Sequence, residues 1–185
     1  VTSLEDEELL VRETVRLFRD HPALLAWYLD DEPGSEMVSW VDDHQRWVHE
    51  EDPDHPTYLV HWKLPAIGEF SQTADILGTD PYPVPKRELR MAYDHTRETV
   101  AQVLGLKPVW QVPQAFNWAS YRTEEADEYR SPTMAEMRSM AWQCIIGGAR
   151  GLLFYSWFDL WKMHERGDED FYARWEDVKT VAGEI

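Results

Sequence analysis

The feature that most constrains this chain is an apolar run that ends in three consecutive carboxylates. Residues 21–34 read HPALLAWYLDDEPG, so that Asp30, Asp31 and Glu32 come directly after the apolar residues 23–29. Such a run has the length of a strand that is buried on both faces, which in α/β proteins is a parallel strand. These folds carry their chemistry at the carboxyl ends of parallel strands. The three acidic residues therefore mark a candidate site, with a solvated acidic turn as the alternative interpretation.

The rest of the sequence predicts helices that alternate with strands. The spacing of Ser3 and Asp6 is that of a helix N-cap, and we expect this first helix to end before Pro22. Further helices are expected over residues 35–50, 86–104, 132–146 and 169–185, and further strands over residues 57–62, 74–83, 108–116 and 151–158. This alternation implies right-handed crossovers and a parallel sheet.

The sheet could be doubly wound or part of a barrel. No glycine-rich phosphate loop follows any expected strand, since Gly147 and Gly148 precede a strand instead, so no nucleotide cofactor is expected. We therefore predict an α/β fold of the partial TIM-type (β/α) barrel kind, with about five parallel strands in a single domain over residues 1–185. A complete barrel needs about 250 residues. The open edges would be closed by an upstream segment or, in a homodimer, by a second copy.

Charge and cysteine content exclude several classes of partner and site. The chain has 35 acidic and 18 basic residues, a net charge of -17, which repels nucleic acid and anionic membrane surfaces. No apolar run approaches the roughly 18 residues of a membrane span. The single cysteine, Cys144, lies in the apolar segment AWQCIIGGA, so neither a disulfide nor a cysteine metal cluster is expected and the thiol is predicted to be buried.

Polar and aromatic residues are paired at the later strand ends. The pairs are His61 with Trp62, Asp80 with Tyr82, Gln114 and Asn117 with Trp118, and Asp159 with Trp157. Aromatic faces pack against the C–H surfaces of sugar rings, while amides, carboxylates and imidazoles bond their hydroxyls. Large aromatic residues are also common core residues, which is the alternative for each one alone. Their recurrence predicts a cleft for a carbohydrate substrate.

The acidic strand end carries a family resemblance. HPALLAWYLDDEPG resembles the segment of retaining glycoside hydrolases of the large (β/α)8 clan, which includes β-galactosidase-like and cellulase-like families, where the fourth barrel strand ends in the acid/base Glu. ADILGTDPYPV, KPVWQVPQAFNW and RGLLFYSWFDL resemble strands six to eight of that group. The resemblance implies that the chain supplies only the last five strands, that Glu32 is the general acid/base and that Trp157 lines a sugar subsite. The nucleophile Glu of the seventh strand is absent, and Gln111 and Gln114 stand there instead.

Glycoside cleavage ordinarily uses two carboxyl groups. Asp31 and Glu32 are adjacent, so an extended strand would point them to opposite faces. The second carboxylate is therefore expected to be Asp80, with Asp159 next, while Asp31 supports Glu32. We expect neighbouring acidic residues and Trp27 to raise the pKa of Glu32. An Asp-Pro turn is the alternative for Asp80.

The predicted function is a glycoside hydrolase that degrades a β-linked oligosaccharide or polysaccharide by carboxylate acid/base catalysis. A carbohydrate-binding or structural remnant of a glycosidase barrel, without catalysis, is the alternative. A metal-dependent hydrolase built from His61, Glu32 and Asp80 is a third class, but no histidine pair has the usual helical ligand spacing, and no metal is expected.

Overall fold

A computed structural model describes residues 3–185 of the protein. All five expected strands form, and every strand pair is parallel. One sheet has the order β1-β2-β3, and β4 pairs with β5 in a second, two-stranded sheet. A parallel bridge between Leu77 and Val109 joins the two sheets, and a second one joins Gln114 to Tyr155. The strands are β1 (Trp27–Asp31), β2 (Thr57–Val60), β3 (Ile76–Gly78), β4 (Trp110–Gln111) and β5 (Gly151–Leu152).

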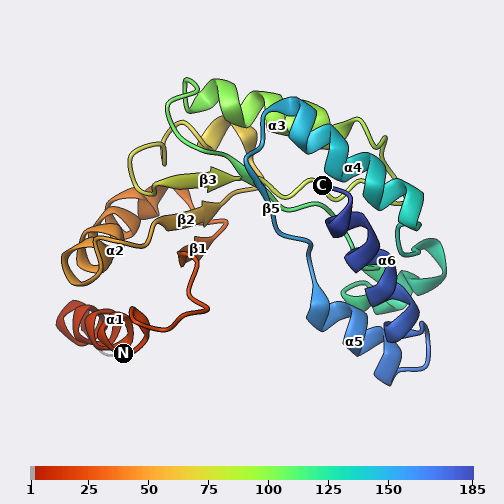
Figure 1. The fold of residues 1–185 in the computed structure, drawn as a ribbon, viewed down its shortest axis with the longest axis horizontal. Coiled ribbons are helices and arrows are strands. Elements are labelled where there is room, and N and C mark those ends of the chain that lie inside the picture. The colour runs from red at the N-terminus through yellow and green to blue at the C-terminus, as the bar shows by residue number, and fades with distance from the viewer. Residues whose placement is uncertain (1–2) are drawn as a thin grey trace.

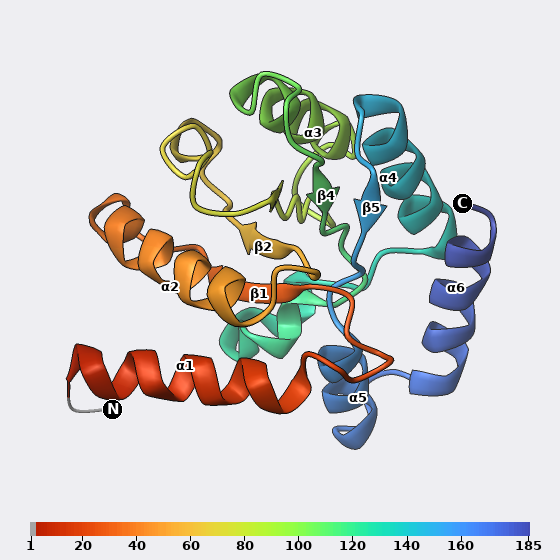
Figure 2. The same ribbon diagram turned by 60° about the vertical axis from the view of Figure 1, so that its left-hand side comes forward.

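The helices lie on the outer side of an open arc, and the strands run along its inner side (Figure 1). Helix α1 and helix α5 stand toward the two ends of the arc, which is not a closed barrel (Figures 1 and 2). The helices are α1 (Leu4–Phe18), α2 (Val38–Glu51), α3 (Met91–Gln102), α4 (Met134–Gly147), α5 (Trp157–Glu165) and α6 (Phe171–Gly183). Short 3-10 turns are η1 (Ser35–Met37), η2 (Leu64–Ala66), η3 (Trp118–Ser120) and η4 (Thr123–Glu128). None of the helices described between residues 3 and 185 is long and apolar enough to cross a membrane.

Local sequence signals set several helix ends. Ser3 caps α1 and accepts a hydrogen bond from the backbone N–H of Asp6 at 3.1 Å, as its spacing predicts. Thr133 and Glu136 form a reciprocal capping box at the start of α4. Helix α4 ends at Gly147, and Gly148 follows with a φ of 112°, a conformation that glycine adopts without strain.

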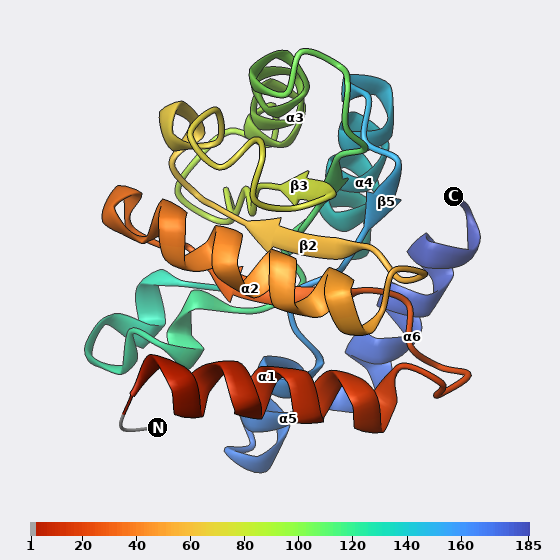
Figure 3. The ribbon, with the colours of Figure 1, turned by 90° about the vertical axis from the view of Figure 1, so that its left-hand side faces the viewer.

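Two apolar clusters hold the helices to the outer side of the strands. Under α2 and α3, the buried residues include Val41, Leu59, Leu77 and Val109. Under α4, α5 and α6, they include Met140, Cys144, Leu160 and Val181. Cys144 is a free, buried thiol, as predicted, and burial raises its pKa to about 11. Figure 3 shows α2 lying across the sheet of β1, β2 and β3.

All five strands are shorter than expected, and the differences at the first and the last strand affect the site. The first strand occupies residues 27–31 rather than 23–29, so Asp30 and Asp31 lie inside β1. The last strand ends at Leu152 rather than at residue 158, because Ser156 caps a new helix and accepts from the backbone N–H of Asp159 at 3.1 Å. The aromatic segment FYSWF thus leads into α5 instead of extending β5.

Candidate active site

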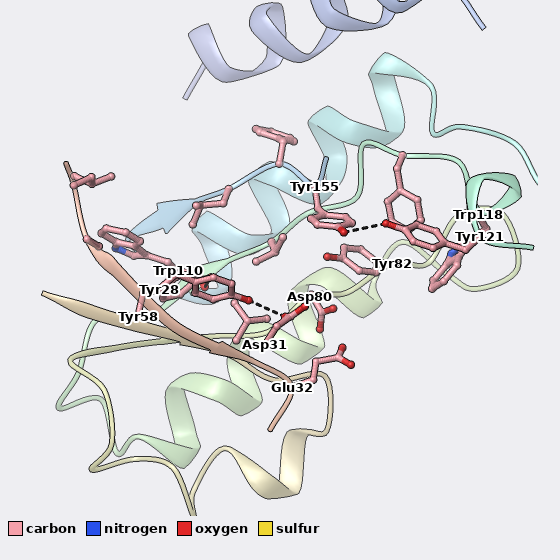
Figure 4. Close-up of a pocket in the computed structure, with 17 residues that line it drawn as sticks. Tyr28, Asp31, Glu32, Tyr58, Asp80, Tyr82, Trp110, Trp118, Tyr121 and Tyr155 are labelled. Atoms are coloured by element: carbon pink, nitrogen blue, oxygen red, sulfur yellow. Dashed lines mark hydrogen bonds between the residues drawn. The ribbon is translucent and has the colours of Figure 1, made fainter. Parts of the chain in front are cut away.

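A cavity of about 520 Å³ lies on the inner side of the arc. Tyr58 and Val60 of β2 and Val112, just after β4, form part of its apolar lining. Three carboxylates also line it: Asp31 at the end of β1, Glu32 just after it, and Asp80 two residues after β3 (Figure 4). The acidic side chains lie at the carboxyl ends of two parallel strands with β2 between them, which is where such sheets place their sites.

Glu32 and Asp31 line the same cavity because the chain does not stay extended at Glu32. The φ of Glu32 is 57°, in the left-handed region that non-glycine residues seldom adopt and that costs about 1–2 kcal/mol. Its backbone N–H donates to the carbonyl of Val60 at 3.0 Å, which ties this turn to the end of β2. The expectation that the two adjacent carboxylates would point to opposite faces is therefore wrong, since it assumed an extended strand.

Two of the carboxyl groups have raised pKa values. Burial, and then the negative charge of Glu32, raise the pKa of Asp80 to about 8. Partial burial, and then the charge of Asp31, raise the pKa of Glu32. Asp80 Oδ1 is buried and has no hydrogen-bond partner among residues 3–185. A pair of carboxyl groups in this setting retains a proton more readily than two separate carboxyl groups would.

Asp31 is held by neighbours in its own strand. Its Oδ1 accepts a hydrogen bond from the Tyr28 hydroxyl at 2.7 Å, and its backbone N–H donates to Asp30 Oδ1 at 2.8 Å. Asp31 thus sits beside Glu32 with its side chain directed by a tyrosine (Figure 4).

Tyrosines line much of the rest of the cavity, and of these the sequence predicted only Tyr82. Tyr82 stacks on Tyr155 with ring centroids 5.8 Å apart, and the hydroxyls of Tyr121 and Tyr155 lie 2.9 Å apart (Figure 4). Burial raises the pKa values of Tyr28, Tyr58 and Tyr82, so their hydroxyls stay protonated. Tyr28 lies within the continuous apolar run of residues 23–29, which does not show which face of the strand it occupies. Tyr121 lies in a loop that has no periodicity.

A second cavity adjoins the first. Its volume is about 1070 Å³, and Glu32, Asp80, Tyr82 and Trp118 line both cavities. Trp62 lines only the second. Of the residues proposed from sequence, this joined space therefore brings together Glu32, Asp80, Asp31, Tyr82, Trp118 and Trp62.

Three buried polar residues proposed from sequence serve the backbone instead. His61 Nε2 lies 2.9 Å from the carbonyl of Pro33, and its Nδ1 accepts from the N–H of Lys63 at 3.0 Å. Gln114 accepts from the N–H of Val84 at 2.9 Å and donates back to the carbonyl of the same residue at 3.0 Å. Gln111 accepts from the N–H of Thr79 at 2.6 Å. None of the three is among the residues that line either cavity.

Three further candidates lie around the start of α5. Asn117 caps η3, and its amide donates to Glu169 at 3.0 Å. Asp159 is buried and accepts from Ser120 at 2.9 Å and from the Tyr121 hydroxyl at 2.8 Å, so it supports a cavity tyrosine without lining the cavity. Trp157 is 51% exposed and stacks on Trp161 with centroids 6.0 Å apart. The cavity linings contain none of these three residues.

The described residues contain no group of three His, Cys, Asp or Glu side chains arranged to hold a metal ion. His61 does not join Glu32 and Asp80, because both of its ring nitrogens engage backbone groups. Burial also lowers the pKa of His61, which keeps the ring neutral.

No protein-family model and no curated protein matches the sequence. Solved structures do match it. They include a β-galactosidase from Halorubrum lacusprofundi (TM-score 0.65, 13% identity, 83% of this chain and 36% of that one). A β-glucuronidase from an uncultured Clostridium sp. has a TM-score of 0.56 at 14% identity, over 81% of this chain and 29% of that one. A glycoside hydrolase family 5 mannosidase from Rhizomucor miehei has a TM-score of 0.55 at 12% identity, over 82% of this chain and 46% of that one.

The chain spans less than half the length of each of these three proteins. Identities this low establish the fold and nothing finer. They agree with the resemblance at the acidic strand end, and with the open arc of five parallel strands. The chain therefore has the fold of part of a (β/α)8 barrel, similar to that of these solved glycosidases.

Proposed function

We propose that the protein is a glycoside hydrolase that cleaves a β-linked oligosaccharide or polysaccharide, with Glu32 and Asp80 as its two carboxyl groups. The observation that carries the proposal is that both line one cavity at the carboxyl ends of β1 and β3, and that both have raised pKa values. Perturbed acids that share a cavity are typical of catalytic sites.

The chemistry needs one protonated and one ionised carboxyl group. The protonated group donates its proton to the glycosidic oxygen as the bond from that oxygen to the anomeric carbon breaks. The ionised group stabilises the positive charge that develops on the sugar ring. The oxygen of a water molecule then bonds to the anomeric carbon, and a proton of that water passes to the carboxylate that had donated one.

Glu32 and Asp80 interact closely enough to hold one proton between them as a pair, and Asp80 is the ionised group when the proton is on Glu32. We assign proton donation to Glu32, because its side chain is more exposed than that of Asp80 and can reach a leaving group. Asp31 lies beside Glu32, and its negative charge helps to raise the pKa of Glu32.

The aromatic lining suits a carbohydrate. Tyr82 and Trp118 border both cavities, and Trp62 extends the aromatic surface into the second. Their faces can pack on sugar rings while the protonated tyrosine hydroxyls bond sugar hydroxyls.

A second candidate function is carbohydrate binding without cleavage. The observation that favours it is the end of β4, where the resemblance places a nucleophile and where Gln111 and Gln114 are buried among backbone partners. In this case the same aromatic surface would hold a sugar, and the raised pKa of Asp80 would reflect its burial and the charge of Glu32 without a catalytic role.

A leaving-group series tests the proposal. Glu32→Gln is expected to lower kcat about 10²–10⁴-fold for glycosides with poor leaving groups. It should lower kcat much less for a dinitrophenyl glycoside, whose leaving group needs no proton. Asp80→Asn is expected to slow both substrates. The matched control is Glu36→Gln in η1, which removes a carboxylate outside both cavities.

Three outcomes decide between the alternatives. If Asp80→Asn, rather than Glu32→Gln, shows the leaving-group dependence, Asp80 is the proton donor and Glu32 is the ionised group. Equal activity in Glu32→Gln and Glu36→Gln would show that the cleavage is not carried out at this site. If the wild-type protein binds saccharides but hydrolyses no aryl glycoside of a broad panel, the second candidate function is correct.

A further inference from the structure

The second cavity carries a concentration of positive charge in a strongly acidic protein. Its lining includes four basic residues, Lys63, Lys86, Arg87 and Arg122, against three acidic ones, whereas the whole chain has 18 basic and 35 acidic residues. Basic side chains therefore outnumber acidic ones in this lining, on a molecule whose net charge is -17.

The basic side chains come from successive loops at one end of the sheet. Lys63 follows β2, Arg87 follows β3, and Arg122 follows β4. The carboxyl ends of neighbouring parallel strands lie side by side, so the fold gathers these cations beside the candidate site. The arrangement depends on the topology, because the three residues are widely separated along the chain.

Three of these cations have no acidic partner. Lys86 is paired with Glu128 at 2.5 Å, but no carboxylate of residues 3–185 lies within 4 Å of Lys63, Arg87 or Arg122 in an ion pair. Most other basic residues of this chain are paired, so three unpaired cations in one cavity are available to an anionic ligand.

Aromatic rings hold two of these cations in position. The guanidinium carbon of Arg122 lies 5.6 Å from the ring centroid of Trp118, and Lys63 Nζ lies 5.2 Å from that of Trp62. The same cavity thus offers flat apolar faces for sugar rings and charged donors beside them. Arginine forms paired, charge-assisted hydrogen bonds with the two oxygens of a carboxylate or sulfate.

We propose that this second cavity binds a saccharide that carries carboxylate or sulfate groups, with Arg87, Arg122 and Lys63 as the residues that select the anion. This inference rests on the proposed function, since it names the substrate class of the same site. The net negative charge of the protein disfavours polyanions in general, so the preference depends on these local cations.

Calorimetric titration tests the inference. It uses the Glu32→Gln variant, because this substitution is expected to slow cleavage of the probes. The probes are three tetrasaccharides of one linkage: a glucose tetramer, a glucuronic acid tetramer and a 6-sulfated glucose tetramer. We expect at least one acidic probe to bind about tenfold more tightly than the neutral one, as one charge-assisted hydrogen bond allows. The advantage should shrink with added salt. Which acidic probe binds better distinguishes carboxylate from sulfate.

Single variants locate the effect. Arg87→Gln and Arg122→Gln are each expected to weaken binding of the acidic probe about five- to tenfold and to leave the neutral probe unchanged. The matched control is Arg46→Gln, an exposed cation of α2 outside the cavity. All three residues are exposed, and a thermal melt checks that each variant folds. Equal affinity for acidic and neutral probes, or an equal loss in Arg46→Gln, would overturn the inference.

The result is separable from that of the proposed function. Hydrolysis of neutral glycosides without any preference for acidic probes would refute the inference and leave the proposed function standing. If the wild-type protein cleaves none of the glycosides but binds an acidic probe tightly and in an arginine-dependent way, the proposed function is refuted and the inference stands.

Discussion

Asp80 carries a carboxyl group that favours its neutral form. Because its pKa in the folded protein is raised from 3.8 to about 8, its stabilising contribution is complete below about pH 4 and is lost as the pH rises toward 8. Asp80→Asn removes this ionisation. We expect the variant to be about 1–2 kcal/mol more stable than the wild type at pH 8, and the difference to vanish near pH 4.

Urea unfolding of both proteins between pH 4 and pH 8 measures this difference. The control is Asp20→Asn, which removes a carboxylate whose side chain is 95% exposed. A variant that is less stable than the wild type at pH 8 would contradict the raised pKa of Asp80. The same substitution is expected to lower activity, so stability and function would move in opposite directions at this residue.

At the scale of single residues, the sequence predicted the carboxyl groups better than the aromatic ones. Glu32 and Asp80 were found because each follows an apolar strand, and both line one cavity. Tyr121 was not predicted, because it reaches the cavity from the loop between η3 and η4, where contacts with residues far along the chain, among them Tyr155 and Asp159, hold it.

At the scale of elements, Gln111 joins β4 to the end of β3 and to α3. Its side-chain oxygen accepts from the N–H of Thr79 at 2.6 Å, and its nitrogen donates to the Thr96 hydroxyl at 2.9 Å, all in a fully buried site. We expect Gln111→Ala to lower the free energy of unfolding by about 2–4 kcal/mol, since it leaves a void and unpaired polar groups. Gln72→Ala, at an exposed glutamine, is the control.

Gln111→Glu addresses the missing nucleophile directly. The side chain does not line the cavity, so the new carboxylate cannot reach a sugar, and burying its charge is expected to destabilise the protein. Chemical denaturation and an aryl glycoside assay check both expectations. A gain of activity in this variant would show that β4 presents residue 111 to the substrate.

Element existence was easier to predict than element boundaries. All five strands and the capped start of α1 follow from apolar runs and cap residues in the sequence. Helix α5 was missed, because the aromatic run FYSWF suits a strand equally well, and the hydrogen bond between Ser156 and Asp159 decides for a helix.

At the scale of the whole molecule, the arc has two open edges. Among the described strands, the only sheet partner of β1 is β2, and the only sheet partner of β5 is β4. Leu25, 68% exposed beside β1, and Leu153, 40% exposed after β5, leave apolar surface there. Either an upstream segment of a longer protein or, in the isolated chain, a second copy would cover these unpaired backbone groups and this apolar surface, and we expect the isolated chain to associate through its edges.

Sedimentation of the isolated chain is expected to give about twice the mass of 21.8 kDa. Leu25→Glu should shift the chain toward the monomer, whereas Leu106→Glu, 81% exposed between α3 and β4, should not. A wild-type chain that remains monomeric and stable at high concentration would contradict this prediction.

The order of the elements, the parallel sheet and the acidic strand end can be predicted from local patterns, because they depend on periodicity, capping and strand-to-turn transitions. Which side chains meet depends on how the elements pack. The left-handed backbone of Glu32 turns two adjacent carboxylates into one cavity, and distant loops bring unpaired cations beside them. The packed backbone around Gln111 and Gln114 removes both from the site. Such outcomes depend on contacts between segments far apart in the chain, which local sequence patterns do not encode.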